Sequence, residues 1–171
     1  DKATVDIALK ASLTGHLVFS TLHTNDAPSS ITRLQNMGTP NYLISAALTL
    51  IMAQRLARKN CSECSIIDEN VTPKLLNSIG FLPEQSARAK IYKGKGCDQC
   101  GNSGYKGRMG IYEILEIDKE LKQGILSDLS QTELNSIAKK NGFKTMQEMG
   151  HDLLLSGDLS FSEYERVLQS N

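Results

Sequence analysis

The sequence has no net charge, no long hydrophobic run and no export signal. Nineteen Lys and Arg balance nineteen Asp and Glu, whereas a nucleic-acid-binding domain normally carries an excess of basic residues. The longest apolar-rich stretch, residues 42–53, is too short to span a bilayer, and no signal peptide is visible. Hydrophobic residues make up 40% of the 171 residues and charged residues only 22%, which excludes an acidic disordered tail. We therefore expect a globular chain with no direct membrane span and no nucleic acid partner.

The chain also lacks a complete set of catalytic residues. A nucleotide site normally needs a phosphate loop of the type Gly-x-x-x-x-Gly-Lys-Ser/Thr. The one Gly-Lys pair, Gly94-Lys95, has Ala89 in place of the first glycine, and Gly96 follows the lysine. There is no Ser-His-Asp or zinc-protease signature either. Since the sequence starts at Asp1 and enters patterned sequence at once, we expect a fragment of a longer protein that is catalytically inactive by itself.

A buried strand and a polar cluster are predicted near the start of the chain. Residues 1–13 are good helix formers, stopped by Thr14-Gly15. Leu17–Leu22 is a short, nearly continuous apolar run, typical of a strand that is buried on both faces of a parallel sheet. His23 follows this run directly, and ligands of open α/β sheets bind at the carboxyl ends of strands. His23 is therefore a candidate site residue, although a lone histidine more often serves capping or core packing. His16 would lie at the opposite end of the strand or in the preceding loop.

Helix signals dominate the remaining sequence outside residues 61–107. Asn25 or Asp26 can cap a helix that tolerates Pro28 in its first turn. Further helices are expected over residues 41–48, 72–78, 118–126, 131–140, 145–155 and 161–169, and strands over residues 50–59, 89–93 and 108–117. Three capping boxes support the last helices, Ser130-x-x-Glu133, Thr145-x-x-Glu148 and Ser160-x-x-Glu163, with Gly142 and Gly157 where C-caps are expected. His151 falls within a predicted helix and is interpreted as structural or solvated.

All four cysteines belong to two Cys-x-x-Cys pairs, Cys61/Cys64 and Cys97/Cys100. Two such turns bring four thiolates to one ion, and four thiolates without an open position form a structural Zn²⁺ site. Without an export signal, a reducing compartment and a metal are favoured over disulfides. The spacing therefore predicts a structural zinc site with these four ligands.

Other interpretations of the cysteines stay open. They include reduced thiols, two disulfides, an iron–sulfur cluster and a redox centre, although a redox centre needs only one pair. A zinc ribbon on nucleic acid is a further alternative. Its face would be formed by Lys90, Tyr92, Lys93, Lys95, Tyr105, Lys106 and Arg108.

Three stretches resemble one family in the same order. Residues 14–26 (TGHLVFSTLHTND) resemble the histidine box of the secretion ATPase superfamily, specifically the type II secretion and type IV pilus assembly ATPases. Residues 51–58 (IMAQRLAR), followed by a Cys-x-x-Cys pair, are similar to the same family and closer to its pilus-assembly branch. Residues 96–100 (GCDQC) and 104–113 (GYKGRMGIYE) complete the resemblance, which covers residues 1 to about 117.

This resemblance implies properties that the residues alone do not. Family members are hexameric cytoplasmic ATPases with a RecA-like motor domain, which bind ATP and Mg²⁺. They dock on an inner-membrane platform protein and drive polymerisation of pilins or pseudopilins. Their phosphate loop and catalytic glutamate precede the histidine box, so Asp1 would match the end of the Walker B segment. By the family pattern, His23 lies near the γ-phosphate, and His16 with Thr24 supports the same loop.

The resemblance also assigns the parts of the chain. Residues 1–60 and 108–117 would be the back half of a RecA-like P-loop ATPase core, with a parallel or mixed sheet. Residues 61–107 would be an inserted subdomain that binds zinc through Cys61, Cys64, Cys97 and Cys100. Residues 118–171 would be a C-terminal helical portion. Since retraction ATPases lack the zinc subdomain, the cysteines indicate assembly or secretion. The alternative is a stand-alone zinc-ribbon adaptor that binds a protein partner or nucleic acid.

Overall fold

The computed structural model describes residues 2–24 and 26–169. The chain divides into two compact units, each built from two segments of sequence. Unit 1 comprises Asp1–Ala53 and Glu113–Thr145, and unit 2 comprises Gln54–Tyr112 and Met146–Asn171. Two residues with a predicted role lie outside the described residues. They are Asp1, expected at the end of a Walker B segment, and Asn25, a candidate helix cap. No helix in residues 2–24 and 26–169 is long and apolar enough to cross a membrane.

The helices of unit 1 confirm the predictions made from local sequence signals. They are α1 (Lys2–Leu13), α2 (Ser29–Asn36), α3 (Asn41–Ala47), α6 (Lys119–Leu126) and α7 (Gln131–Lys140). Helix α7 begins at the predicted capping box, in which Ser130 accepts from the backbone N–H of Glu133 and Glu133 reaches back to Ser130. Gly142, just beyond the helix, has φ +91°, a conformation that glycine adopts without strain.

An apolar cluster joins these helices to the end of the last strand. Its buried members come from the start of α2, from α3, from the residues around 115–117, and from α6 and α7: Ala27, Ile31, Leu34, Ile44, Leu115, Ile117, Leu121, Ile125, Leu134 and Ala138. Helices α3 and α6 contact each other, as do α6 and α7. Unit 1 therefore has a hydrophobic core of its own.

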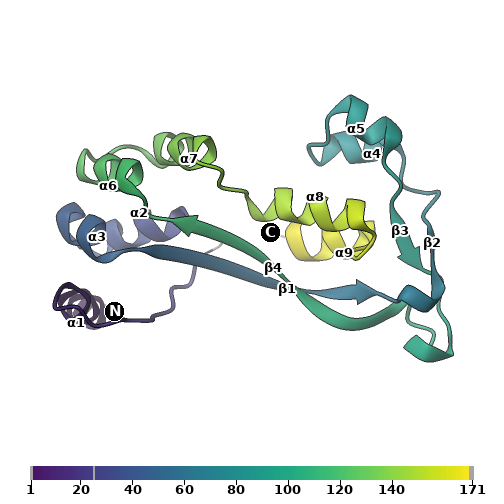
Figure 1. Cartoon of the computed structure of the whole chain (residues 1–171), viewed down its shortest axis with the longest axis horizontal. Helices are drawn as coiled ribbons and strands as arrows, with labels where there is room; N and C mark the ends of the chain where they lie inside the picture. Colours follow the sequence, from purple (N-terminus) through teal and green to yellow (C-terminus); the bar gives the residue numbers. More distant parts are fainter. Residues whose placement is uncertain (1, 25, 170–171) are drawn as a thin grey trace. The chain divides into compact units, whose positions relative to one another are not determined.

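The sheets differ from the expected parallel or mixed sheet. The described strands form two separate pairs, β1 (Leu50–Asn60) with β4 (Tyr105–Glu116), and β2 (Ser65–Ile67) with β3 (Tyr92–Gly94). Strands β2 and β3 are antiparallel, and the arrows of β1 and β4 point in opposite directions (Figure 1). The expectation of parallel strands was wrong for these residues, because the cysteine pairs that follow β1 and precede β4 come together. Strand β4 therefore starts beside the end of β1, where the N–H of Cys61 donates to the carbonyl of Gly104 at 2.9 Å, and it runs back along β1.

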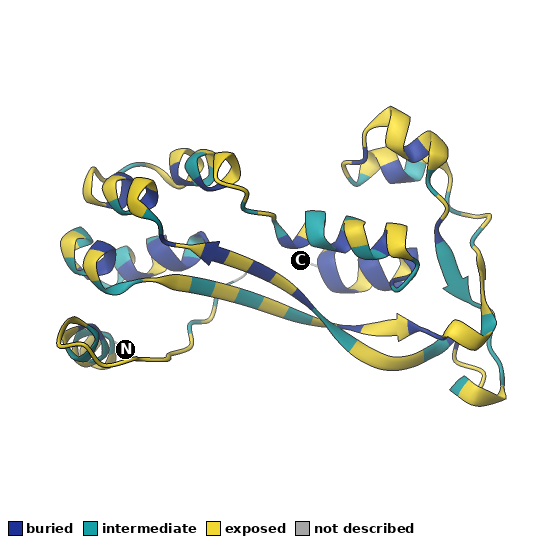
Figure 2. Ribbon diagram, viewed as in Figure 1, coloured by how far each residue is buried: buried dark blue, intermediate teal, exposed yellow. Residues whose placement is uncertain are grey.

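The prediction of a buried strand at Leu17–Leu22 is also wrong for this structure. The segment has no regular secondary structure and is not part of either sheet. Leu17 is 81% exposed and Phe19 87% exposed, and Figure 2 shows the chain after α1 as exposed. A strand buried on both faces needs hydrogen-bonded neighbours on each side, and the described residues supply none.

Unit 2 contains the cysteine-bracketed insertion and the last helices. Its further elements are the 3₁₀ turns η1 (Ser62–Cys64) and η2 (Asp98–Cys100), helices α4 (Pro73–Ser78), α5 (Pro83–Arg88), α8 (Met146–Ser156) and α9 (Phe161–Tyr164), and a π-helical turn, η3 (Glu165–Gln169). Helix α4 begins where predicted, with Thr72 accepting from the N–H of Leu75 at 3.3 Å. Helix α5 was not predicted, and the strand expected over residues 89–93 is instead β3.

A buried carboxylate joins β1 to the last helices of unit 2. The Glu163 side chain is completely buried. One oxygen accepts from the backbone N–H of Arg58 at 2.7 Å, and the other accepts from Arg58 Nε at 2.9 Å and from Arg166 Nε at 2.8 Å. Arg58 also lies over the ring of Tyr105, 4.1 Å from its centroid. Because both arginines contact the same carboxylate, Glu163 holds α9 and η3 against β1.

Candidate functional site

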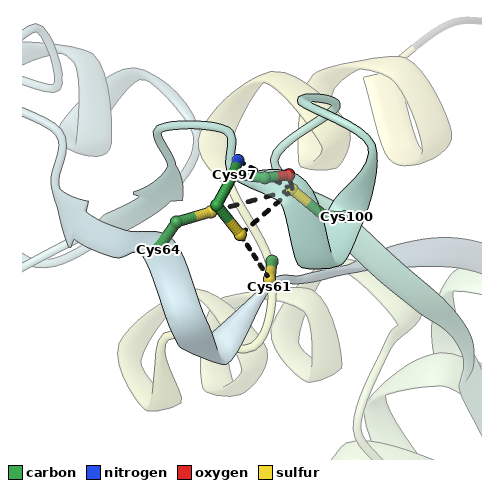
Figure 3. A group of neighbouring side chains, drawn as sticks. All are labelled: Cys61, Cys64, Cys97 and Cys100. Atoms are coloured by element: carbon green, nitrogen blue, oxygen red, sulfur yellow. Dashed lines mark hydrogen bonds between the residues drawn. The ribbon is translucent and has the colours of Figure 1, made fainter.

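The four cysteines converge in unit 2, as Figure 3 shows. Cys61 follows β1, Cys64 ends η1, and Cys97 and Cys100 flank η2. All four sulfur atoms lie within 4.8 Å of one another. Cys61 is buried and the other three are partly buried. Two short turns thus place four soft ligand atoms around one point, and the cluster could hold a metal ion.

The sulfur–sulfur distances fit a tetrahedral ion better than a disulfide. They are 3.9 Å for Cys61–Cys97, 3.9 Å for Cys64–Cys100 and 3.7 Å for Cys97–Cys100. Four sulfurs placed tetrahedrally at about 2.3 Å from a zinc ion would be about 3.8 Å apart. A disulfide needs sulfurs about 2.05 Å apart, and all four cysteines are free thiols.

Backbone N–H groups point at two of the sulfur atoms. Gly96 N–H lies 3.3 Å from the sulfur of Cys64, and Cys97 and Gly104 N–H lie 3.2 and 3.3 Å from that of Cys100. Burial raises the pKa of Cys100. The backbone N–H groups of Cys97 and Gly104 and the neighbouring sulfurs together have a larger, opposite effect, and they lower this pKa to about 6. At neutral pH Cys100 is therefore mainly a thiolate, the form that binds metals.

For Cys64 and Cys97 the effect of burial is larger than that of the contacts that lower the pKa, so the net shift is upward. Burial raises the pKa of Cys64 to about 11, although the Gly96 N–H lowers it in part. Burial likewise raises the pKa of Cys97. Without a cation only part of the cluster is ionised, so a bound divalent ion would displace protons from the remaining thiols.

A close backbone approach supports the second cysteine turn. A Cβ atom on Gly94 would overlap the carbonyl of Gly104, and one on Gly104 would come close to the carbonyl of Gly94. Gly104 also has φ +76°, a region that favours glycine. The N–H of Cys61 donates to the carbonyl of Gly104 at 2.9 Å, so this approach also links the two cysteine pairs.

The predicted histidine site lies in unit 1 and takes the form of a shallow pocket. His23 and Thr24 line an open depression of about 330 Å³ together with Asp26, Ser29, Thr32, Arg33, Asn36 and Gln131. His23 is exposed and Thr24 is half-buried. His16 is exposed, does not line this depression, and lies 3.0 Å from the Thr14 hydroxyl through its Nδ1. The structure thus brings His23 and Thr24 together but not His16.

The turn after His23 is held by several hydrogen bonds. Asp26 accepts from the N–H of Ser29, the first residue of α2, at 2.7 Å, although Pro28 and not Asp26 occupies the N-cap position. The Thr24 and Ser30 hydroxyls are 2.9 Å apart. Glu113, near the end of β4, accepts from the N–H of Ala27 at 2.8 Å. The turn is therefore fixed although the preceding segment is exposed.

Sequence reasoning missed Glu113 and Arg33 as part of this region. Glu113 ends the GYKGRMGIYE stretch, and its alternation with Ile111 and Leu115 places it on the buried face of β4. A carboxylate at a buried position of a strand was therefore a readable signal. Arg33 carries no comparable signal, because helices commonly expose arginine.

The third histidine is structural, as interpreted from the sequence. His151 Nε2 lies 3.0 Å from the Tyr164 hydroxyl, and its ring packs on Phe81 at 4.4 Å between centroids. Burial lowers the pKa of His151, although its hydrogen bond to the backbone of Ile79 raises it in part. His151 thus connects α8 to α9 and to the turn between α4 and α5.

Known proteins resemble this chain along nearly its whole length. A family model described as "Type II/IV secretion system protein" matches residues 1–166. The type IV pilus assembly ATPase PilB of Thermus thermophilus is 43% identical over 163 residues, 95% of this chain and 18% of that protein. PilB of Pseudomonas aeruginosa is 42% identical, covering 98% of this chain and 29% of that protein. The putative type II secretion system protein E of Escherichia coli is 39% identical, covering 98% and 33%.

A solved structure shares the fold. The pilus retraction motor PilT, crystallised with bound ADP, superposes with a TM-score of 0.61 at 24% identity, covering 97% of this chain and 36% of that one. The chain thus spans a third or less of the length of the three sequence relatives named above. With a family model matched over residues 1–166 and relatives of about 40% identity along nearly all of its length, this protein belongs to the type II/IV secretion system family.

Proposed function

We propose that this chain is the C-terminal part of a hexameric cytoplasmic ATPase that powers type IV pilus assembly or type II protein secretion. The observation that carries the proposal is the 43% identity to a pilus assembly ATPase over 95% of the chain. The intact protein would bind peripherally at the inner membrane, on the platform protein of the pilus or secretion machine. ATP and Mg²⁺ would be held mainly by residues outside this chain.

In this proposal the parts of the chain have different tasks. Residues 1–60 and 108–117 belong to a RecA-like ATPase core, residues 61–107 to an inserted zinc subdomain, and residues 118–171 to a helical portion. The exposed apolar run at Leu17–Leu22 is the segment that would pair with strands of the rest of the core. Its exposed leucine and phenylalanine side chains support this, since apolar side chains of this size are normally covered in the working protein.

The four cysteines are proposed to hold structural Zn²⁺. The sulfur spacing, the set of four thiol ligands and the N–H groups directed at sulfur support this assignment. The ion would hold the two cysteine turns together and leave no position open for a substrate. Elemental analysis of the purified protein should find about one zinc per chain, and a protein that folds without bound metal would contradict the proposal.

His23 is the residue of this chain proposed to act near the γ-phosphate. Its imidazole lies beside the hydrogen-bonded turn that precedes α2. Formation or loss of a hydrogen bond from an imidazole N–H to a phosphate oxygen would therefore shift that turn and the helix that follows it. Thr24 supports the turn through its contact with Ser30, and His16 supports the same loop from its other end. Positioning and charge stabilisation of this kind are what phosphoryl transfer requires.

The test uses the full-length protein that contains this chain. His23→Ala should abolish ATP-driven assembly or secretion while the melting temperature stays unchanged, since His23 is exposed. Thr132→Ala, which alters an exposed residue of α7 outside the proposed core strand, is the control and should keep the wild-type rate. ATP turnover at the wild-type rate in His23→Ala would refute the role of His23. The 171-residue chain alone should show no ATP hydrolysis.

A further inference from the structure

Glu113 is a buried carboxylate beside the histidine-containing turn. It is 3% exposed, on the face of β4 that also carries the buried Leu115. Its Oε1 accepts from the N–H of Ala27, which is fully buried and belongs to the apolar cluster of unit 1. Burial of a charged side chain among apolar residues is unfavourable unless hydrogen bonds compensate, so Glu113 contributes more than packing at this position.

The contacts of this turn differ in how far they reach along the chain. The Asp26–Ser29 and Thr24–Ser30 contacts link residues three and six positions apart. They fix the turn relative to α2. The Glu113–Ala27 bond links residues 86 positions apart, and it fixes the same turn relative to β4.

A hydrogen-bond acceptor suits this position, because the N-terminal end of a helix leaves N–H groups without partners in the helix. The N–H of Ser29, the first residue of α2, donates to Asp26. The N–H of Ala27, two residues before α2, donates to Glu113. Asp26 thus acts from within the turn, whereas Glu113 acts from β4.

We propose that Glu113 is a positioning residue: by holding the backbone of Ala27 it sets where His23 lies relative to β4. This inference rests on the proposed ATPase function, and it assigns to β4 a role in aligning the imidazole. Glu113 does not contact the reacting atoms in this proposal. Its effect should therefore fall on turnover and leave nucleotide binding nearly unchanged.

Three variants of the full-length protein separate positioning from simple destabilisation. Glu113→Gln keeps an oxygen that can accept from Ala27 and should stay within about twofold of the wild-type kcat. Glu113→Asp withdraws the acceptor by one methylene group, and Glu113→Ala removes it. Both should lower kcat by about 10- to 100-fold, with KM for ATP within about twofold, as expected when a catalytic group is misplaced by about 1 Å. If Glu113→Ala does not fold, Glu113→Asp decides the question.

The matched control is Glu163→Gln, which alters a buried carboxylate that also accepts a distant backbone N–H but lies in unit 2. It should lower the melting temperature and leave kcat unchanged. A normal kcat in Glu113→Asp, or equal losses in Glu113→Asp and Glu113→Gln, would overturn the positioning role.

Amide exchange provides a second measurement that does not depend on ATP hydrolysis. The Ala27 amide should exchange slowly in wild type and in Glu113→Gln, and at least about tenfold faster in Glu113→Asp. The amides of Leu121 and Ile125, in the same apolar cluster, should stay protected in all variants. If the full-length wild type does not hydrolyse ATP, the proposed function fails. If His23→Ala retains full turnover, the proposed role of His23 fails even where Ala27 exchange follows this pattern. If His23→Ala is inactive while Glu113→Asp is normal, only the positioning role fails.

Discussion

Replacing Glu163 by Gln should remove a defined part of the acid sensitivity of the 171-residue chain. Burial raises the pKa of this carboxyl. The guanidinium groups of Arg166 and Arg58 and the Arg58 N–H together have a larger, opposite effect, and they lower the pKa from 4.5 to about 2. Because the pKa is lower in the folded state, Glu163 stabilises the fold above pH 4.5, and this stabilisation is lost as the pH falls toward 2. The difference between the two pKa values corresponds to about 3 kcal/mol in full, of which about 2 kcal/mol is lost by pH 3.

The assay is chemical unfolding followed by circular dichroism, at several pH values between 7 and 3. At pH 7 Glu163→Gln should be less stable than wild type, since a neutral amide replaces the carboxylate between two arginines. The two proteins should converge as the pH falls, because wild type loses about 2 kcal/mol more than the variant. Glu84→Gln, which alters an exposed carboxylate of α5, should run nearly parallel to wild type. Parallel stability curves for Glu163→Gln and wild type would show that Glu163 does not carry this acid sensitivity.

Three further predictions concern the cysteine cluster and the exposed segment. Cys61→Ser should lower the zinc content to well below one per chain and expose residues 61–107 to protease, as should chelation of wild type; unchanged zinc content would exclude Cys61 as a ligand. Gly94→Ala should also lose zinc, because its Cβ would overlap the Gly104 carbonyl, whereas Gly101→Asn, with open space around a φ of +57°, should keep it. Phe19→Ser should reduce self-association of the chain measured by light scattering, since this ring is 87% exposed; equal association would show that the segment is not responsible.

Helices could be predicted from the sequence where their signals are local. The capping box at Ser130 and Glu133 marks the start of α7, and the glycine at position 142 lies two residues beyond its last residue, Lys140. The box at Ser160 is formed only in part. The Ser160 hydroxyl accepts from the N–H of Glu163, but the Glu163 carboxylate contacts arginines instead of returning to Ser160. Arg58 lies 105 residues before Glu163, so the sequence of the helix itself could not predict this contact.

Strands were harder to predict because their partners lie far away in the sequence. The apolar run at Leu17–Leu22 has the composition of a buried strand, yet composition does not supply the neighbours that bury it. In contrast, β1 and β4 were predicted as strands over residues 50–59 and 108–117, but their antiparallel pairing was not predicted. The cysteine cluster was predictable because the ligand spacing within each pair is short. The role of Glu113 was not, because it depends on contact with Ala27, 86 residues away.

The long interval between Arg58 and Glu163 has a consequence for synthesis on the ribosome. Arg58 is translated 105 residues before Glu163, an interval of about 5 to 20 s at usual rates of elongation. Cys100, the last of the four thiols, is translated 63 residues before Glu163. All four proposed zinc ligands are therefore present before α9 and η3, whose Glu163 binds Arg58, have been made. Under the proposed zinc assignment, the two cysteine turns can close around the ion before the last helices of unit 2 pack against β1.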